Sequence, residues 1–166
     1  MAHIEHPFPP VVDESCQILI FGSFPSVKSR EDGFFYSHPQ NRFWRMLAAV
    51  FDEHIPFDTA AKKAFLLQHH IALWDVIASC SIDGSSDASV RDAGPVDVNR
   101  ITAIAPISRV ICNGALAGKL YQRYLQPITG IQADILPSTS PANASWSLDR
   151  LVVAWKPVLS EAVYNP

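Results

Sequence analysis

Three polar loops of the sequence carry side chains suited to binding a planar base. The longest, residues 23–40, contains an aromatic run that includes Phe35 and Tyr36, and Asn41 follows it directly. An aromatic ring offers a face on which a base can stack, and an amide offers both a directed donor and a directed acceptor. These residue types favour a base-binding pocket with residues 23–40 as its floor.

Two shorter loops carry further polar groups. Asn113 and Gly114 follow one apolar run, and the sequence Pro-Ser-Thr-Ser-Pro-Ala-Asn at residues 137–143 follows another. Hydroxyl and backbone N–H groups in such a loop can hold a phosphate. Asn113 is therefore a candidate for a contact to the base, and residues 137–143 are candidates for contacts to a nucleic-acid backbone.

The segments between these loops predict the elements that would position them. Short apolar runs predict four buried strands, at residues 17–21, 71–77, 109–112 and 131–136. Apolar spacing and capping residues predict helices at residues 41–51, 58–69, 99–105, 115–125 and 147–162, the last kinked or shifted by Pro157. Residues 79–95, rich in Ser, Asp and Gly, are expected to form a polar loop. Strands alternating with helices predict an α/β fold whose parallel sheet is covered on both faces, so the three polar loops would meet at one edge.

Composition narrows the class of protein. With 166 residues and 48% apolar content, the chain is expected to form one domain over residues 1–166, with residues 1–15 as an N-terminal extension. A formal net charge of −3 argues against coating nucleic acid through bulk charge, although a local basic patch can still grip a few phosphates. The three cysteines are widely spaced and predict neither a disulfide framework nor a metal site. We expect a soluble, cytoplasmic monomer without a membrane segment.

Three stretches resemble a known family. They are Gly-Ser-Phe-Pro at residues 22–25, Phe-Tyr-Ser-His-Pro-Gln-Asn-Arg-Phe-Trp at residues 35–44, and Leu-Pro-Ser-Thr-Ser-Pro-Ala-Asn at residues 136–143. Together they resemble the uracil-DNA glycosylase superfamily, and within it the DNA-deoxyinosine (hypoxanthine-DNA) glycosylase branch. The resemblance implies a three-layer α/β/α sandwich with a four-stranded parallel sheet. It also implies an enzyme that flips a deaminated base out of DNA and hydrolyses its N-glycosidic bond without a metal or cofactor.

The resemblance also implies roles for individual residues. Asn41 matches the asparagine that is important in the inosine branch and would position water or the sugar, and Asn113 would read the base edge. The expected base-binding residues are Ser23, Phe24, Phe35 and Tyr36. The expected DNA-binding residues are Lys28, Arg42, Ser138, Thr139, Ser140, Pro141 and Asn143.

Two departures separate the chain from other branches. Mismatch-specific uracil glycosylases have a catalytic asparagine where this chain has Phe24, and common uracil enzymes have a histidine where it has Leu136. Both differences suit the inosine branch and weaken the case for efficient uracil removal.

Several alternatives stay open from the sequence. Asn41 could be only a helix cap, Asn113 could serve only a turn, and Asp75 or Asp87 could activate water. At the level of function, the rivals are a hydrolase or transferase acting on free nucleosides and a non-enzymatic binder of single strands. The damaged base that is preferred, and any preference between single and double strands, are not determined.

Overall fold

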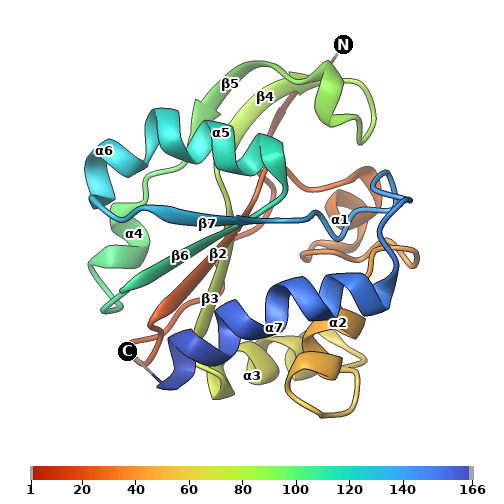
Figure 1. Ribbon diagram of the computed structural model, residues 1–166. Coiled ribbons are helices and arrows are strands. Elements are labelled where there is room, and N and C mark those ends of the chain that lie inside the picture. The colour runs from red at the N-terminus through yellow and green to blue at the C-terminus, as the bar shows by residue number, and fades with distance from the viewer. Residues whose placement is uncertain (1, 165–166) are drawn as a thin grey trace.

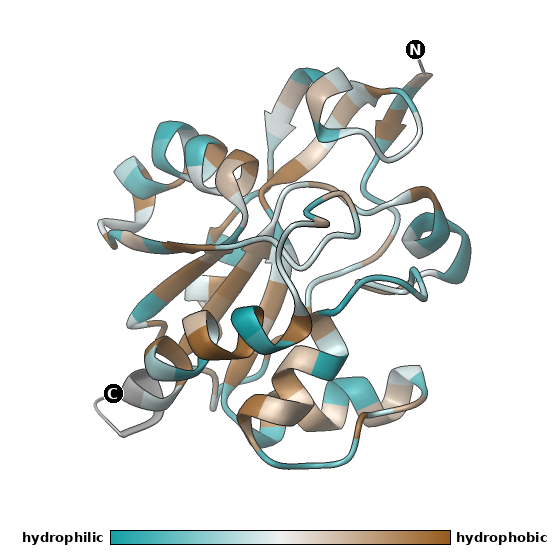
Figure 2. Cartoon of the chain, turned by 45° about the vertical axis from the view of Figure 1, so that its right-hand side comes forward, coloured by the Kyte–Doolittle hydropathy of each residue, from teal (hydrophilic) through white to brown (hydrophobic). Residues whose placement is uncertain are grey.

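The centre of the molecule is a parallel sheet of four strands. The computed structural model describes residues 2–164, and the strands run in the order β3-β2-β6-β7 (Figure 1). Their bounds are Ile18–Gly22 for β2, Ile71–Asp75 for β3, Arg109–Asn113 for β6 and Ala133–Leu136 for β7. All five residues of β2 and of β3 are buried, as expected for apolar runs covered on both faces, and Figure 2 shows the hydrophobic colour along the central strands. The predicted sheet is confirmed.

Helices cover both faces of this sheet. The helices are α2 (Phe43–Val50), α3 (Thr59–Gln68), α4 (Asn99–Thr102), α5 (Ala115–Tyr124), α6 (Gln126–Thr129) and α7 (Leu148–Tyr164). In Figure 1, α2, α3 and α7 lie on one face and α4, α5 and α6 on the other, so the three-layer sandwich is confirmed. Asp58 caps α3 as predicted, because its carboxylate accepts a hydrogen bond of 2.7 Å from the backbone N–H of Ala61. Pro157 lies inside α7, which begins at Leu148 without a shifted start.

The strand order creates a crevice at the carboxyl edge of the sheet. β2 lies between β3 and β6, so the chain leaves β2 toward one side and returns to the other. Ligands of open α/β sheets bind at such a reversal point. The last residues of neighbouring strands pair across this edge, Gly22 with Asp75 and Asn113 with Leu136.

A second, antiparallel sheet was not expected. Residues 79–95 were predicted to be a polar loop, and this prediction is wrong: they contain most of β4 (Ile77–Ile82), a short 3₁₀ helix (Asp87–Ser89) and β5 (Arg91–Pro95). The strand expected over residues 71–77 is two strands, β3 and β4, which separate at Val76. Only some residues of β4 are buried, since one side of this sheet faces outward. Its polar residues therefore hid the strand from a search for apolar runs.

The N-terminal segment is part of the folded body, although it was expected to be an extension. Strand β1 (Ala2–Glu5) pairs with β4 and gives the antiparallel order β1-β4-β5. Val11 forms an antiparallel bridge to Leu73, and Phe8 and Val11 are buried in the core. These contacts join positions far apart along the chain, which local sequence patterns do not encode. Among the described residues, no helix is long and apolar enough to cross a membrane.

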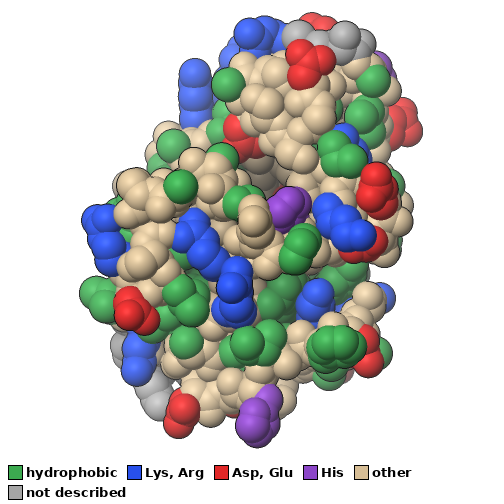
Figure 3. All heavy atoms as spheres, turned by 90° about the vertical axis from the view of Figure 1, so that its right-hand side faces the viewer, with side chains coloured by type: hydrophobic (Ala, Val, Ile, Leu, Met, Phe, Trp, Pro, Cys, Tyr) green, Lys and Arg blue, Asp and Glu red, His purple; other side chains and the backbone are tan. Residues whose placement is uncertain are grey.

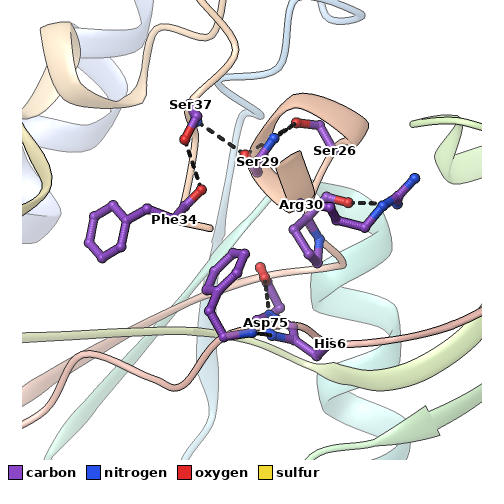
Figure 4. Close-up of polar contacts among 9 residues, drawn as sticks. His6, Ser26, Ser29, Arg30, Phe34, Ser37 and Asp75 are labelled. Carbon is purple, nitrogen blue, oxygen red and sulfur yellow. Dashed lines mark hydrogen bonds and ion pairs between the residues drawn. The ribbon is translucent and has the colours of Figure 1, made fainter. Parts of the chain in front are cut away.

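The loop that follows β2 contains a short helix. Helix α1 (Val27–Asp32) begins after Ser26, whose hydroxyl accepts a hydrogen bond from the Ser29 N–H, and it ends at Gly33 with a φ of 75°. The Ser29 hydroxyl accepts a hydrogen bond of 3.1 Å from the Ser37 N–H, and the Ser37 hydroxyl donates to the Phe34 carbonyl at 2.9 Å (Figure 4). These bonds brace the aromatic segment against α1.

Candidate functional site

A cavity of about 1020 Å³ lies at the carboxyl edge of the parallel sheet. Figure 3 shows the face on which the molecule is hollowed, with several lysine and arginine side chains near the hollow. The lining includes eleven of the predicted site residues: Ser23, Phe24, Phe35, Tyr36, Asn41, Asn113, Ser138, Thr139, Ser140, Pro141 and Asn143. The structure therefore brings the three predicted loops together around one pocket.

Thr139 connects the two predicted asparagines. Its hydroxyl donates to Asn41 Oδ1 at 2.9 Å and accepts from Asn113 Nδ2 at 3.0 Å, and its backbone N–H donates to Asn113 Oδ1 at 3.0 Å. Thr139 was expected to contact DNA, but it is fully buried and its polar groups are occupied by this network. The network holds both amides in fixed positions.

Asn41 is also bonded to the start of α2. Its Oδ1 accepts a second hydrogen bond of 2.9 Å from the backbone N–H of Phe43, so the cap-like role left open from the sequence is present. Because both bonds use the oxygen, the Nδ2 group keeps its two N–H donors. Asn41 lines the pocket, so these donors are available to a bound molecule.

The aromatic residues form an apolar wall of the pocket. Phe35 is only 2% exposed and packs edge-on against Phe8, with ring centroids 4.7 Å apart. The ring of Tyr36 stacks on Phe43 at 4.1 Å, so one face of that ring is already covered. The indole N–H of Trp44 donates to the Phe35 carbonyl at 3.1 Å and fixes the backbone of this wall. Stacking of a base on these rings remains a prediction.

Two predicted DNA contacts do not line the cavity. Lys28 lies on α1, where its Nζ is 3.3 Å from Asp32 Oδ1. Arg42 donates to the carbonyls of Ser140 at 2.9 Å and Asn143 at 3.2 Å, and also to the carbonyl of Trp146. The guanidinium of Arg42 thus holds the backbone of the loop after β7 in place.

That loop is further stabilised by its own side chains. The Ser140 N–H donates to the Ser138 hydroxyl at 3.1 Å, and the Asn143 amide donates to the Ser138 carbonyl at 3.0 Å.

Gly114 has a φ of 100°, and a Cβ added there would lie 3.1 Å from Ser138 Cβ. The close approach of the two loops therefore requires glycine at position 114.

The family of this chain follows from comparison with known proteins. The family model described as the Uracil DNA glycosylase superfamily matches residues 9–158. The chain belongs to the uracil DNA glycosylase superfamily. Its similarity to a hypoxanthine DNA glycosylase of Methanosarcina acetivorans is 37% identity over 149 residues, which are 89% of this chain and 93% of the relative. A hypoxanthine DNA glycosylase of Methanosarcina barkeri is 33% identical over 138 residues, 82% of this chain and 86% of the relative.

The fold agrees with this assignment. A solution NMR structure from Methanosarcina acetivorans, described as a candidate uracil DNA glycosylase, superposes with a TM-score of 0.81 at 32% sequence identity. The match covers 95% of this chain and 98% of that one. The resemblance to this superfamily, including its hypoxanthine-acting members, is therefore confirmed.

Sequence reasoning missed part of this glycosylase-family pocket. Asp75, considered only as a water-activating group, lines the buried wall at 3% exposure, and His6 lies behind it. The β4–β5 connection places Asp87, the other carboxylate considered for activating water, at the pocket, where its Oδ1 accepts a 3.0 Å hydrogen bond from the Ser23 hydroxyl. Partial removal from water raises the pKa of the Asp87 carboxyl. The hydrogen bond from Ser23 opposes this rise, and the charge of nearby Asp75 adds to it. A carboxylate at the end of an apolar strand was the available signal for Asp75, whereas nothing in the local sequence pointed to His6.

The structure offers no metal site in the part of the chain that it describes, residues 2–164, because no three His, Cys, Asp or Glu side chains gather there. The polar groups that line the pocket are amides, hydroxyls and carboxylates.

Proposed function

We propose that this protein is a monofunctional DNA glycosylase that flips out a deaminated base, hypoxanthine foremost, and hydrolyses its N-glycosidic bond to leave an abasic site. Membership of the superfamily and two relatives named hypoxanthine DNA glycosylase support this function. The observation that carries it for this chain is the Asn41–Thr139–Asn113 network at the wall of a cavity large enough for a base and its sugar. We further propose that the protein acts as a monomer.

The network suits the charge changes of glycosidic hydrolysis. Departure of the base leaves positive character on the sugar and negative charge on the base, and pre-placed dipoles that face these charges lower the barrier. In our proposal the Asn41 Nδ2 group orients the attacking water or the sugar, because its oxygen is already held by Thr139 and Phe43. Asn113, held at both ends by Thr139, keeps the remaining hydrogen-bonding capacity of its amide for the base.

We assign DNA binding to the loop after β7 and to the nearby Lys and Arg side chains. Ser138, Ser140, Pro141 and Asn143 lie at the cavity, and Arg42 holds the backbone of this loop in place. We propose that Lys28 contributes a phosphate contact from α1. Release of counterions from a few such contacts makes binding salt-dependent despite the negative net charge.

Cleavage of defined oligonucleotides tests this function. The purified protein is incubated with matched strands containing hypoxanthine, xanthine, uracil or only normal bases, and abasic sites are then cleaved with alkali. Strand breaks at hypoxanthine, and none in the normal strand, are expected. Activity on free deoxyinosine without oligonucleotide cleavage would instead indicate a nucleoside hydrolase or transferase. Tight binding without product would indicate a binding module.

A further inference from the structure

The buried wall of the pocket contains a carboxylate that is held on one side only. Asp75 Oδ2 lies 2.8 Å from His6 Nε2, and Figure 4 shows the two side chains facing each other. The Nδ1 atom of His6 accepts a hydrogen bond of 3.4 Å from the Phe8 N–H, so a neutral His6 carries its proton on Nε2 and donates it to Asp75. The other oxygen, Oδ1, turns toward Gly22, where an added Cβ would lie 2.4 Å from it.

A buried hydroxyl that makes no hydrogen bond within the described residues lies near this oxygen. The Tyr36 hydroxyl is 2.6 Å from the same point above Gly22, and it is one of two buried side-chain atoms without a hydrogen bond within the described residues. Burial, followed by the charge of Asp75, raises the pKa of Tyr36, and the nearby Asn113 side chain opposes this rise only in part, so the hydroxyl keeps its proton. Leaving a buried polar group without a hydrogen bond is energetically costly, so such a group in a pocket indicates a ligand that satisfies it.

We propose that Asp75 and Tyr36 read the edge of the flipped base, and that His6 is a positioning residue that orients Asp75 for this contact. Asp75 Oδ1 accepts the ring N–H of the base, and the Tyr36 hydroxyl donates to the adjacent carbonyl oxygen. The inference rests on the proposed glycosylase function and deepens it by naming the chemical class of base.

That class follows from the pattern of donor and acceptor. Deamination converts the ring-nitrogen acceptor and amino donor of adenine or cytosine into a ring N–H donor and a carbonyl acceptor. Hypoxanthine and uracil gain this edge by deamination, and xanthine, the deamination product of guanine, also carries it, whereas adenine would place a ring-nitrogen lone pair against the Asp75 carboxylate. Guanine carries the same edge, but its additional amino group and its stable pairing in duplex DNA set it apart.

His6 comes from the N-terminal segment, which precedes the matched family region of residues 9–158. Its backbone N–H donates to the Ala78 carbonyl at 2.7 Å, and its ring lies edge-on to Phe8 at 4.7 Å and to Phe24 at 6.0 Å. These contacts fix the imidazole behind Asp75, outside the cavity lining. In this proposal the segment before the family region therefore contributes to base selection.

Binding to uncleavable oligonucleotides tests the proposal. One strand carries hypoxanthine and the other carries unsubstituted purine, which lacks both the N–H and the carbonyl, each on a 2′-fluoroarabinose that resists hydrolysis. Fluorescence anisotropy is expected to show that wild-type protein prefers hypoxanthine by about tenfold or more, the effect of one hydrogen bond to a charged group. In Asp75→Asn, His6 holds the amide oxygen and the amide N–H₂ faces the base, so hypoxanthine binding falls about tenfold, while purine, whose ring nitrogen accepts from the amide, binds as well as before or better.

The positioning role of His6 has its own readout. His6→Phe keeps a ring of similar size but removes the donor, and it should reduce the preference for hypoxanthine over purine about fivefold, as loss of a hydrogen bond predicts. His6→Gln restores much of the preference because its amide can donate to Asp75. His3→Gln, an exposed change in the same N-terminal segment, leaves the preference unchanged.

Three outcomes would overturn the proposal. Equal weakening of both oligonucleotides by Asp75→Asn and His6→Phe would show a structural role only. No change in either variant, or no preference for hypoxanthine by a wild-type protein that nevertheless cleaves deoxyinosine strands, would refute the base contact while the glycosylase function stands. Absence of cleavage by wild-type protein would refute the glycosylase function itself. Melting temperatures of all variants report whether each one is folded.

Discussion

The wall of the pocket contains two polar clusters, one formed by Asn41, Thr139 and Asn113 and the other by Asp75, His6 and Tyr36. The clusters differ in how completely their hydrogen bonds are satisfied. At the Asn41 side, Thr139 bonds both asparagines and has no exposed surface. At the Asp75 side, His6 holds one carboxylate oxygen, and the Tyr36 hydroxyl has no partner within the described residues. A satisfied network is rigid before the ligand arrives, whereas an unsatisfied one gains its missing bonds from the ligand. The first arrangement suits chemistry that needs fixed dipoles, and the second suits recognition of a base.

The largest expected effect comes from removing the amide of Asn41. Asn41→Ala should lower the single-turnover rate of hypoxanthine excision by about 100-fold or more, as is typical when a pre-placed donor is lost from a reaction centre. DNA affinity should change far less, because the grip on DNA is assigned to other residues. Rapid-quench kinetics and anisotropy measure the two quantities separately. An equal loss of rate and affinity would reassign Asn41 to structure.

A smaller effect is expected from the residue that joins the asparagines. Thr139→Val keeps the volume but leaves the Asn113 amide without one partner, which should cost about 1–3 kcal/mol in the free energy of unfolding. The excision rate should fall about tenfold, as expected for about 1.4 kcal/mol of lost transition-state stabilisation. Urea denaturation and single-turnover assays test both values. Thr102→Val on α4 is the matched control and should change neither. Unchanged stability in Thr139→Val would show that the Asn41–Thr139–Asn113 network does not stabilise the fold.

At Tyr36, we expect a substitution to slow excision without lowering the free energy of unfolding, unlike at Thr139. Tyr36→Phe removes a hydroxyl that has no partner, so the free energy of unfolding should stay level or rise by up to about 1 kcal/mol. Excision of hypoxanthine should nevertheless slow by about fivefold, since one neutral hydrogen bond to the base is lost. A variant that is both less stable and fully active would contradict the assignment of this hydroxyl to the ligand.

The smallest effect concerns Asp87, whose carboxylate lines the cavity. Its pKa is raised in the folded protein, so ionisation disfavours the fold, and this cost develops as the pH rises from the ordinary pKa of aspartate through the raised one. Asp87→Asn should therefore be more stable than wild type at neutral pH, by roughly 0.5 kcal/mol because solvent reaches this residue. The difference should vanish below about pH 3, where the carboxyl is protonated in both the folded and the unfolded protein. Thermal melts at several pH values give the comparison, and a gain that persists in acid would point to another cause.

Much of the parallel sheet was predictable because its signals are local. The apolar runs of β2 and β6 mark strands buried on both faces, and the helix cap at Asp58 lies within three residues of its partner. The positions of Asn41 and Asn113 after such elements, together with the family motifs, were enough to place them at one pocket.

The antiparallel sheet and the His6–Asp75 pair were not predictable in the same way. β4 mixes buried and partly exposed residues and pairs with a strand from the N-terminus, and His6 contacts Asp75 across 69 positions of sequence. Such pairings depend on where the folded backbone brings distant segments together.

The sequence by itself determined the α/β alternation, the polar loops at the strand ends and the family, because hydrophobic periodicity and short motifs are properties of neighbouring residues. Only the tertiary structure decided that Thr139 is a buried link, that Arg42 braces a loop and that His6 stands behind Asp75. Whether a polar side chain faces a ligand, a neighbour or solvent depends on which of its hydrogen bonds the rest of the fold has already satisfied.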